Sequence, residues 1–192
     1  MTSKQAAACG VFGAATFAIA FVLGSGVILA TGIPATGGLL NIFVCVAIAV
    51  VGAHTVPKVG SATIMMLVTF TLAIPTVTGG PPGIYKPLIG LAIGLAYDAI
   101  VALGGRRRWS VYIGGGAAAM TSILTIFTAM ILLELPGVDK LRPLLLPLAA
   151  VQFALGFFGA VLGTWLYQSK LSKLRVFVSL REDTDEPERH DS

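Results

Sequence analysis

Long apolar runs decide the solvent in which this chain can fold. The run 6–30 contains no charged residue, and about 20 apolar residues are enough to cross the hydrocarbon core of a bilayer. The whole sequence is 56% hydrophobic and 11% charged, with a mean hydropathy of +0.89, which is far from the composition of a soluble domain. Lipid requires every backbone polar group to be paired internally, and these runs lack the alternation of a β-barrel. The sequence therefore predicts an all-α integral membrane protein.

Breakers rich in glycine and proline divide the apolar sequence into six segments. The expected spans are 6–30, 39–53, 60–77, 87–103, 111–135 and 144–168. The second and fourth spans are shorter than the others and must extend into their turns or be shielded by neighbours. Residues 1–181 are thus expected to form one six-helix transmembrane domain, with the first span retained rather than cleaved as a signal peptide.

Lysine and arginine placement predicts that both termini face the cytoplasm. With the N-terminus inside, the cytoplasmic segments hold Lys4, Lys58, Arg106, Arg107, Arg108, Lys170, Lys173, Arg175, Arg181 and Arg189, and the outer loops hold Lys86, Lys140 and Arg142. An even number of spans keeps the large basic clusters on one side. Topology and attraction to anionic lipid explain the net charge of +4, so no nucleic-acid partner is expected.

The end of the chain and the cysteines carry little chemistry. Residues 182–192 are acidic and lack apolar side chains to bury, which predicts a disordered cytoplasmic tail. Cys9 and Cys45 both lie in expected spans without metal-ligand spacing, so we interpret them as packing residues. No metal and no cofactor are expected.

Small residues recur at helical spacing in three of the expected spans, which predicts close helix contacts. Ala6, Gly10 and Ala14 form one stripe in the first span, and Gly90 and Gly94 form another in the fourth. The last span has a third stripe, which contains Gly156, Gly159, Ala160, Gly163 and Thr164. Most such stripes pack a bundle internally, but one of the three is a candidate for contact with another protein.

Polar residues near the outer ends of the spans are candidates for a ligand site, because each is costly to place in a membrane. They are Asn41, Tyr85, Lys86, Glu134 and Gln152. If they project to the same depth, they suit an outward pocket with polar groups above an apolar floor. The structural alternative is that Lys86 extends to the interface, Glu134 caps a helix end and Asn41 begins a helix.

Asp98 is the candidate nearest the middle of the membrane. One interpretation is a relay for protons or another cation. The other is a structural carboxylate held by donors at a helix end or by the basic cluster 106–108.

The chain resembles the substrate-binding S components of energy-coupling factor (ECF) vitamin transporters. The likeness covers nearly the whole length: six spans, both ends inside, the motif Ala6-x-x-x-Gly10-x-x-x-Ala14 and outer loops rich in glycine and proline. The resemblance implies that Ala6, Gly10 and Ala14 dock on a transmembrane coupling subunit. It also implies that a vitamin-like or precursor molecule binds near the outer face. Glycine at the middle position departs from the commonest pattern, which has alanine there, but it is still a small residue, as this contact requires.

The expected function is therefore capture of a small molecule in a prokaryotic plasma membrane, without enzymatic activity of the chain itself. The sequence lacks a Gly-x-x-x-x-Gly-Lys-Ser/Thr motif, so separate ATPase subunits would supply the energy. A self-contained carrier coupled to protons or cations through Asp98 is the first alternative, although no repeat of the two halves is evident. A membrane scaffold is the second.

Overall fold

Six helices of twelve or more residues account for most of the chain that the structure, a computed structural model, describes: residues 1–31, 36–76, 82–134 and 142–174. They are α1 (Ser3–Thr31), α2 (Thr36–Thr55), α3 (Ser61–Leu72), α4 (Lys86–Leu103), α5 (Arg108–Leu132) and α7 (Leu145–Leu166). A 3-10 turn, η1 (Arg142–Leu144), precedes α7, and a π-helical turn, η2 (Tyr167–Leu171), follows it. The prediction of an all-α protein is confirmed for these residues.

The helices fall close to the six expected segments and differ in length at two of them. α2 begins at Thr36 and ends at Thr55, so it extends beyond both ends of the expected span 39–53. α3 ends at Leu72, well before residue 77, and Pro75 follows in a turn where its ring cannot continue a helix. The acidic tail 182–192 lies outside the described residues.

Four helical segments in the described part are long and apolar enough to cross a membrane. They are Ser3–Val27, Lys86–Leu103, Arg108–Leu132 and Arg142–Leu171. Asn41–Thr55 and Ser61–Leu72 are shorter apolar helices. These lengths and compositions are compatible with a multi-pass membrane protein.

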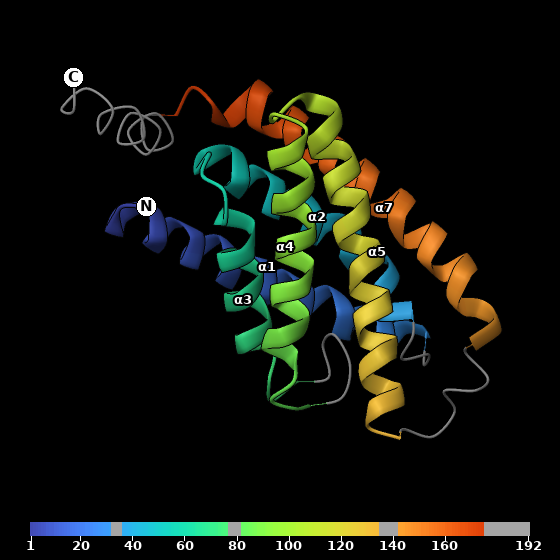
Figure 1. The fold of residues 1–192 in the computed structure, drawn as a ribbon. Helices are drawn as coiled ribbons and strands as arrows, with labels where there is room; N and C mark the ends of the chain where they lie inside the picture. Colours follow the sequence, from blue (N-terminus) through green and yellow to red (C-terminus); the bar gives the residue numbers. More distant parts are fainter. Residues whose placement is uncertain (32–35, 77–81, 135–141, 175–192) are drawn as a thin grey trace.

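The six helices form a closed ring in which each packs mainly on two neighbours. The order around the ring is α1, α2, α7, α5, α4, α3 and back to α1, and α2 also touches α3 and α5. Figure 1 shows α3, α4 and α5 side by side, with α1 and α2 behind them and α7 at the edge. The core is small in side-chain volume: Val50, Ala62, Ile93, Ala119 and Ala160 belong to its main cluster.

Glycines bring the backbones of neighbouring helices together at two of the three small-residue stripes. A Cβ on Gly90 or Gly94 of α4 would collide with backbone of α3, and one on Gly156 of α7 would collide with backbone of α5. Gly159 and Gly163 lie in the same way against backbone of α2. The stripes in α4 and α7 therefore pack the bundle internally.

The face of α1 that enters the bundle differs from its small-residue stripe. Cys9 is fully buried on it, and a Cβ on Gly13 would lie 2.6 Å from the Met65 carbonyl oxygen of α3. The hydroxyl of Thr69 donates to the Gly13 carbonyl at 2.9 Å. α1 is thus fixed to α3 along the line of Gly13, and the line of Gly10 is left outside.

We predict that Gly156→Val lowers the thermal midpoint of the detergent-purified protein strongly, because the added side chain has to displace backbone of α5. Overpacking of this kind costs about 1–3 kcal/mol or more. Gly10→Ala is the matched control: its Cβ meets nothing within 4 Å, and alanine favours helix. An equal loss of midpoint in both variants would contradict the packing described above.

Candidate functional site

Lys86, at the first turn of α4, is completely buried and forms hydrogen bonds to the backbone just after the end of α3. Its side chain has 0% exposure. Its Nζ donates to the Ala73 carbonyl at 2.9 Å and to the Thr76 carbonyl at 2.6 Å. These carbonyls follow the last residue of α3, where helical partners run out. A cation at a helix C-terminus also interacts favourably with the helix dipole.

Asp98, near the other end of α4, acts on the beginning of α3. Its Oδ2 accepts hydrogen bonds from the Thr63 backbone N–H at 2.9 Å and from the Thr63 hydroxyl at 2.7 Å. Thr63 is in the first turn of α3, and the preceding Gly60 has a φ of 92° and supplies no side-chain cap. The Asp98 carboxylate therefore provides the cap from a neighbouring helix.

The two charged side chains have the spacing needed to reach both ends of α3. Asp98 follows Lys86 by twelve residues, which is about 18 Å along a helix. α3 itself has 12 residues and runs antiparallel beside α4 (Figure 1). Negative charge at its N-terminus and positive charge at its C-terminus both complement its dipole. This arrangement agrees with the structural interpretation of Asp98 through helix-end donors; the ion relay stays a prediction.

Asn41 is also used inside the protein. Its Nδ2 donates to the Ala20 carbonyl of α1 at 3.0 Å, and its Oδ1 accepts from the Cys45 thiol at 3.1 Å. The amide thus joins α2 to α1 instead of beginning a helix, since α2 begins at Thr36.

The other three predicted outer residues differ in exposure. Tyr85 precedes α4 and packs on the main core cluster, and partial burial raises the pKa of its phenol, so it is neutral at neutral pH. Glu134 is exposed after the end of α5, with a φ of 51°. Gln152 of α7 is 7% exposed, and its Oε1 has no hydrogen-bond partner among the described residues.

The predicted ligand residues lie toward one end of the bundle. The hydrogen bonds of Lys86 and Asn41 described above are made to residues outside this set. Figure 1 shows α4 beginning and α5 ending at the same end, which carries Tyr85, Lys86 and Glu134. The starting halves of α2 and α7, with Asn41 and Gln152, lie toward this end as well. Of the five, Gln152 is the one with a buried acceptor still available to a ligand.

The predicted docking residues lie on the outside of α1. Ala6 is exposed, and Gly10 and Ala14 are half-buried. A Cβ on Gly10 would meet nothing within 4 Å. Gly10 therefore differs from the glycines of the α4 and α7 stripes, whose Cβ positions lie against the backbone of a described neighbouring helix.

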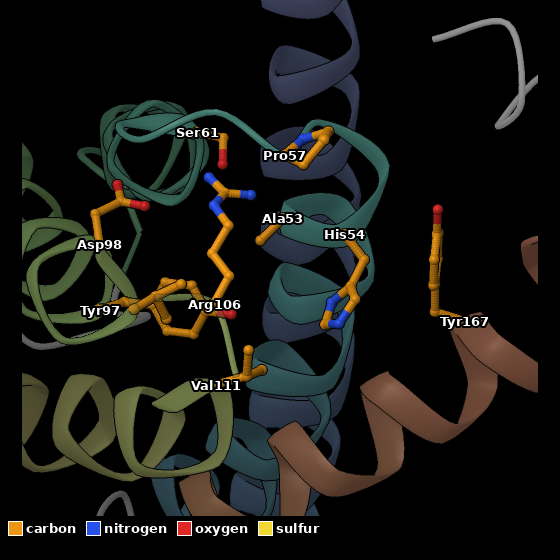
Figure 2. Close-up of a pocket in the computed structure, with 10 residues that line it drawn as sticks. Ala53, His54, Pro57, Ser61, Tyr97, Asp98, Arg106, Val111 and Tyr167 are labelled. Atoms are coloured by element: carbon orange, nitrogen blue, oxygen red, sulfur yellow. The ribbon is translucent and has the colours of Figure 1, made fainter. Parts of the chain in front are cut away.

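A cavity of about 390 Å³ lies at the other end of the bundle from Lys86 and was not predicted from the sequence. Its lining residues are Ala53, His54, Pro57, Ser61, Tyr97, Asp98, Val101, Arg106, Val111 and Tyr167. Figure 2 shows the Arg106 side chain extended toward Ser61, with Asp98 on one side and Ala53 on the other. Arg106 has a φ of 55° and follows Gly105 at 62°, so this tight turn places it at the mouth.

One side of the cavity is formed by a ring pair. The His54 and Tyr167 rings are 5.2 Å apart, and His54 Nδ1 lies 2.8 Å from the Val50 carbonyl. That contact assigns the Nδ1 proton to the backbone bond and leaves Nε2 as an acceptor. The sequence signals for this site were His54, near the end of the second span, and Arg106, which the count of lysine and arginine explained by topology alone.

The fold and these sites define the class of protein as an all-helical chain with helices suited to a membrane. No protein-family model, curated protein or solved structure matches it. Within the described residues no three histidine, cysteine, aspartate or glutamate side chains are grouped to hold a metal ion.

We predict that Lys86→Met destabilises the protein by about 2 kcal/mol or more, because it leaves two carbonyls at the end of α3 without their charged donor. The measurement is the thermal midpoint in detergent, together with amide hydrogen exchange of α3, which should become faster. Lys170→Met is the matched control, since Lys170 is exposed in η2. Equal exchange of α3 in both variants would show that Lys86 does not hold it.

Proposed function

We propose that this chain is the membrane-embedded substrate-binding subunit of an ECF-type importer in a prokaryotic plasma membrane. It captures a small vitamin-like or precursor molecule at its outer face. In this proposal all six helices cross the bilayer, and both termini are cytoplasmic. The observation that carries the proposal is the small-residue stripe of α1, in which Ala6 is exposed and Gly10 has open space beside it.

The α1 stripe supports a docking role because the rest of the bundle does not need it. Glycine inside a helix costs about 1 kcal/mol relative to alanine, and Gly90, Gly94 and Gly156 offset this cost by close backbone contact. Gly10 has no such contact with the described residues. A helix of a second membrane protein, packed on Ala6, Gly10 and Ala14, would give Gly10 a close backbone contact of this kind. A transmembrane coupling subunit is the partner that the ECF resemblance implies.

The basic residues support the proposed orientation. Lys58, the cluster 106–108 and Lys170 with Lys173 belong to the α2–α3 turn, the α4–α5 turn and the end of the last helix. In a bundle of alternating direction these three places share one side, which the positive-inside rule makes cytoplasmic. Lys86 is buried against α3, so it is not a loop charge, and the opposite side then holds only Lys140 and Arg142 of the expected loop cations.

Gln152 supports a ligand site toward the outer end. A buried acceptor without a donor costs about 1–3 kcal/mol, and its Oε1 is such an atom among the described residues. A ligand carrying an N–H or O–H group would recover this free energy on binding. Retention of an unsatisfied group at a binding position is a common exchange of stability for function.

The proposed mechanism assigns energy conversion to other subunits. The chain binds ligand from outside and docks through α1. It then reorients in the membrane while partner ATPases hydrolyse ATP. The contribution of this chain is the binding site, a rigid bundle and the docking surface.

A carrier coupled to protons or another cation is the second candidate, and Asp98 is the observation that favours it. Its Oδ2 is engaged by Thr63, but the side chain also lines the cavity. The two functions are distinguished by uptake into proteoliposomes that contain this chain alone. Uptake driven by a proton gradient and lost in Asp98→Asn would favour the carrier.

We predict that Ala6→Leu combined with Gly10→Leu abolishes cellular uptake but leaves ligand binding unchanged. Leucine at these positions prevents close approach of a partner helix without entering the bundle. A thermal-shift screen against vitamins, their precursors and nucleobases first identifies the ligand, and uptake of that ligand is then measured in cells. Ala102→Leu on the exposed side of α4 is the control. Normal uptake in the variant that combines Ala6→Leu with Gly10→Leu would refute the docking role.

We predict that Gln152→Leu raises the thermal midpoint without ligand and reduces or removes the midpoint shift caused by the ligand. The substitution deletes a buried unpaired acceptor, so the free protein gains stability, whereas the complex loses a hydrogen bond. Gln168→Leu, at an exposed position in η2, is the control. An unchanged ligand shift in Gln152→Leu would exclude Gln152 from the ligand site.

A further inference from the structure

The cavity at the α2–α3 and α4–α5 turns has the features of a second ligand site. Its volume of about 390 Å³ lies in the range of small-molecule pockets, about 300–1,000 Å³. Residues from α2, α3, α4, α5 and η2 line it, so it is formed by five elements that meet at one end of the bundle. Pro57 and Arg106 of the two turns place its mouth at the aqueous end of the bundle.

Tyr97, whose ring is largely buried, supplies a hydroxyl group to the lining of this cavity. Its side chain is 7% exposed and lines the cavity, and no hydrogen bond joins its hydroxyl to another described residue. Figure 2 shows the ring directed toward the base of the Arg106 side chain. Tyrosine hydroxyls in largely buried side chains commonly form a hydrogen bond, and a molecule in the cavity can supply the partner.

Two opposite charges face the same cavity from different sides. Asp98 uses Oδ2 to hold α3, whereas its Oδ1 makes no hydrogen bond to a described residue. The Arg106 guanidinium forms no ion pair with the described carboxylates and extends into the space beside Asp98 (Figure 2). A carboxylate oxygen and a guanidinium are thus both available to a molecule that fits between them.

The charge arrangement selects the chemistry of that molecule. A simple anion attracted by Arg106 would lie beside the Asp98 carboxylate, and a simple cation attracted by Asp98 would lie beside Arg106, so each would be repelled by the second charge. An apolar molecule would leave the Tyr97 hydroxyl unpaired. A molecule with one charge of each sign satisfies both groups.

We propose that this cavity binds a small water-soluble zwitterion of the amino-acid class. Its ammonium group lies at Asp98, its carboxylate group at Arg106, and the Tyr97 hydroxyl bonds to one of them. The mouth at the turns makes the aqueous phase the source of the ligand. This site is separate from the outward site of the proposed function, because it lies at the other end of the bundle from Tyr85 and Lys86.

The test is a thermal-shift and titration-calorimetry series on the full chain in detergent. The probes are glycine, β-alanine and γ-aminobutyrate, in which the two charges are increasingly far apart, with ethylamine and acetate as single-charge controls at equal ionic strength. At least one zwitterion is expected to raise the midpoint by mass action, and ethylamine and acetate are not.

Variants of the lining residues identify the site. Tyr97→Phe and Arg106→Gln are each expected to weaken binding of that zwitterion about tenfold or more, because each loses a hydrogen bond to a charged group. Tyr97→Phe removes an unpaired hydroxyl without changing packing, so the midpoint without ligand should not fall. Arg107→Gln is the control, because it also removes one positive charge but at the neighbouring residue, which does not line the cavity. It should leave the affinity unchanged. Asp98 is kept, because its other oxygen holds α3.

Three outcomes would overturn the proposal: no zwitterion shifts the midpoint, acetate or ethylamine is as effective as the zwitterions, or Arg107→Gln weakens binding as much as Arg106→Gln. Gln152→Leu separates this result from the outward site. A zwitterion shift that persists in Gln152→Leu belongs to the cavity, and its loss there would assign the ligand to the other end and also overturn the proposal.

Discussion

The position of α3 depends on two opposite charges carried by α4. Lys86 and Asp98 bind the backbone at the two ends of α3, and their separation equals the length of that helix. Buried charges are normally costly, but here each is hydrogen-bonded to backbone groups at an end of α3. Close glycine contacts at Gly90 and Gly94 make this possible by bringing the two backbones together. The pair α3–α4 is therefore a rigid wall on which α1 and α5 pack.

Small residues serve two purposes in the same bundle. In α4 and α7 they lie against neighbouring backbone, and the ring of helices requires them there. In α1 the inward line of Gly13 already provides this contact with α3, so the outward line of Gly10 is available for a different partner. One face of α1 thus holds the fold, and the other is the face that the proposed docking role uses.

The sequence predicted the elements better than the roles of their polar residues. Long apolar runs and breakers located the helices, and the cost of polarity in lipid directed attention to Lys86, Asp98 and Gln152. Their partners could not be predicted, because Lys86 meets a carbonyl 13 residues away and Asp98 meets an amide 35 residues away, and backbone groups leave no sequence signature. The cavity needs five elements in place, so Tyr97 resembled an ordinary core residue. The third span was expected to reach residue 77 because its sequence stays apolar, whereas α3 ends at Leu72, shortly before Pro75.

The ring order divides the molecule into two arcs that are local in sequence: α1 with α2, and α3 to α7. They are joined by one short connection, Val56–Gly60. Their main contacts are α1 against α3 and α2 against α7, with smaller contacts of α2 with α3 and α5. Ala53 and His54 contribute the α2 side of the cavity, and the second arc contributes most of the rest. The cavity therefore lies between the two arcs. Because the boundary between the arcs passes through the cavity, the packing of α2 against the second arc sets the width of the cavity.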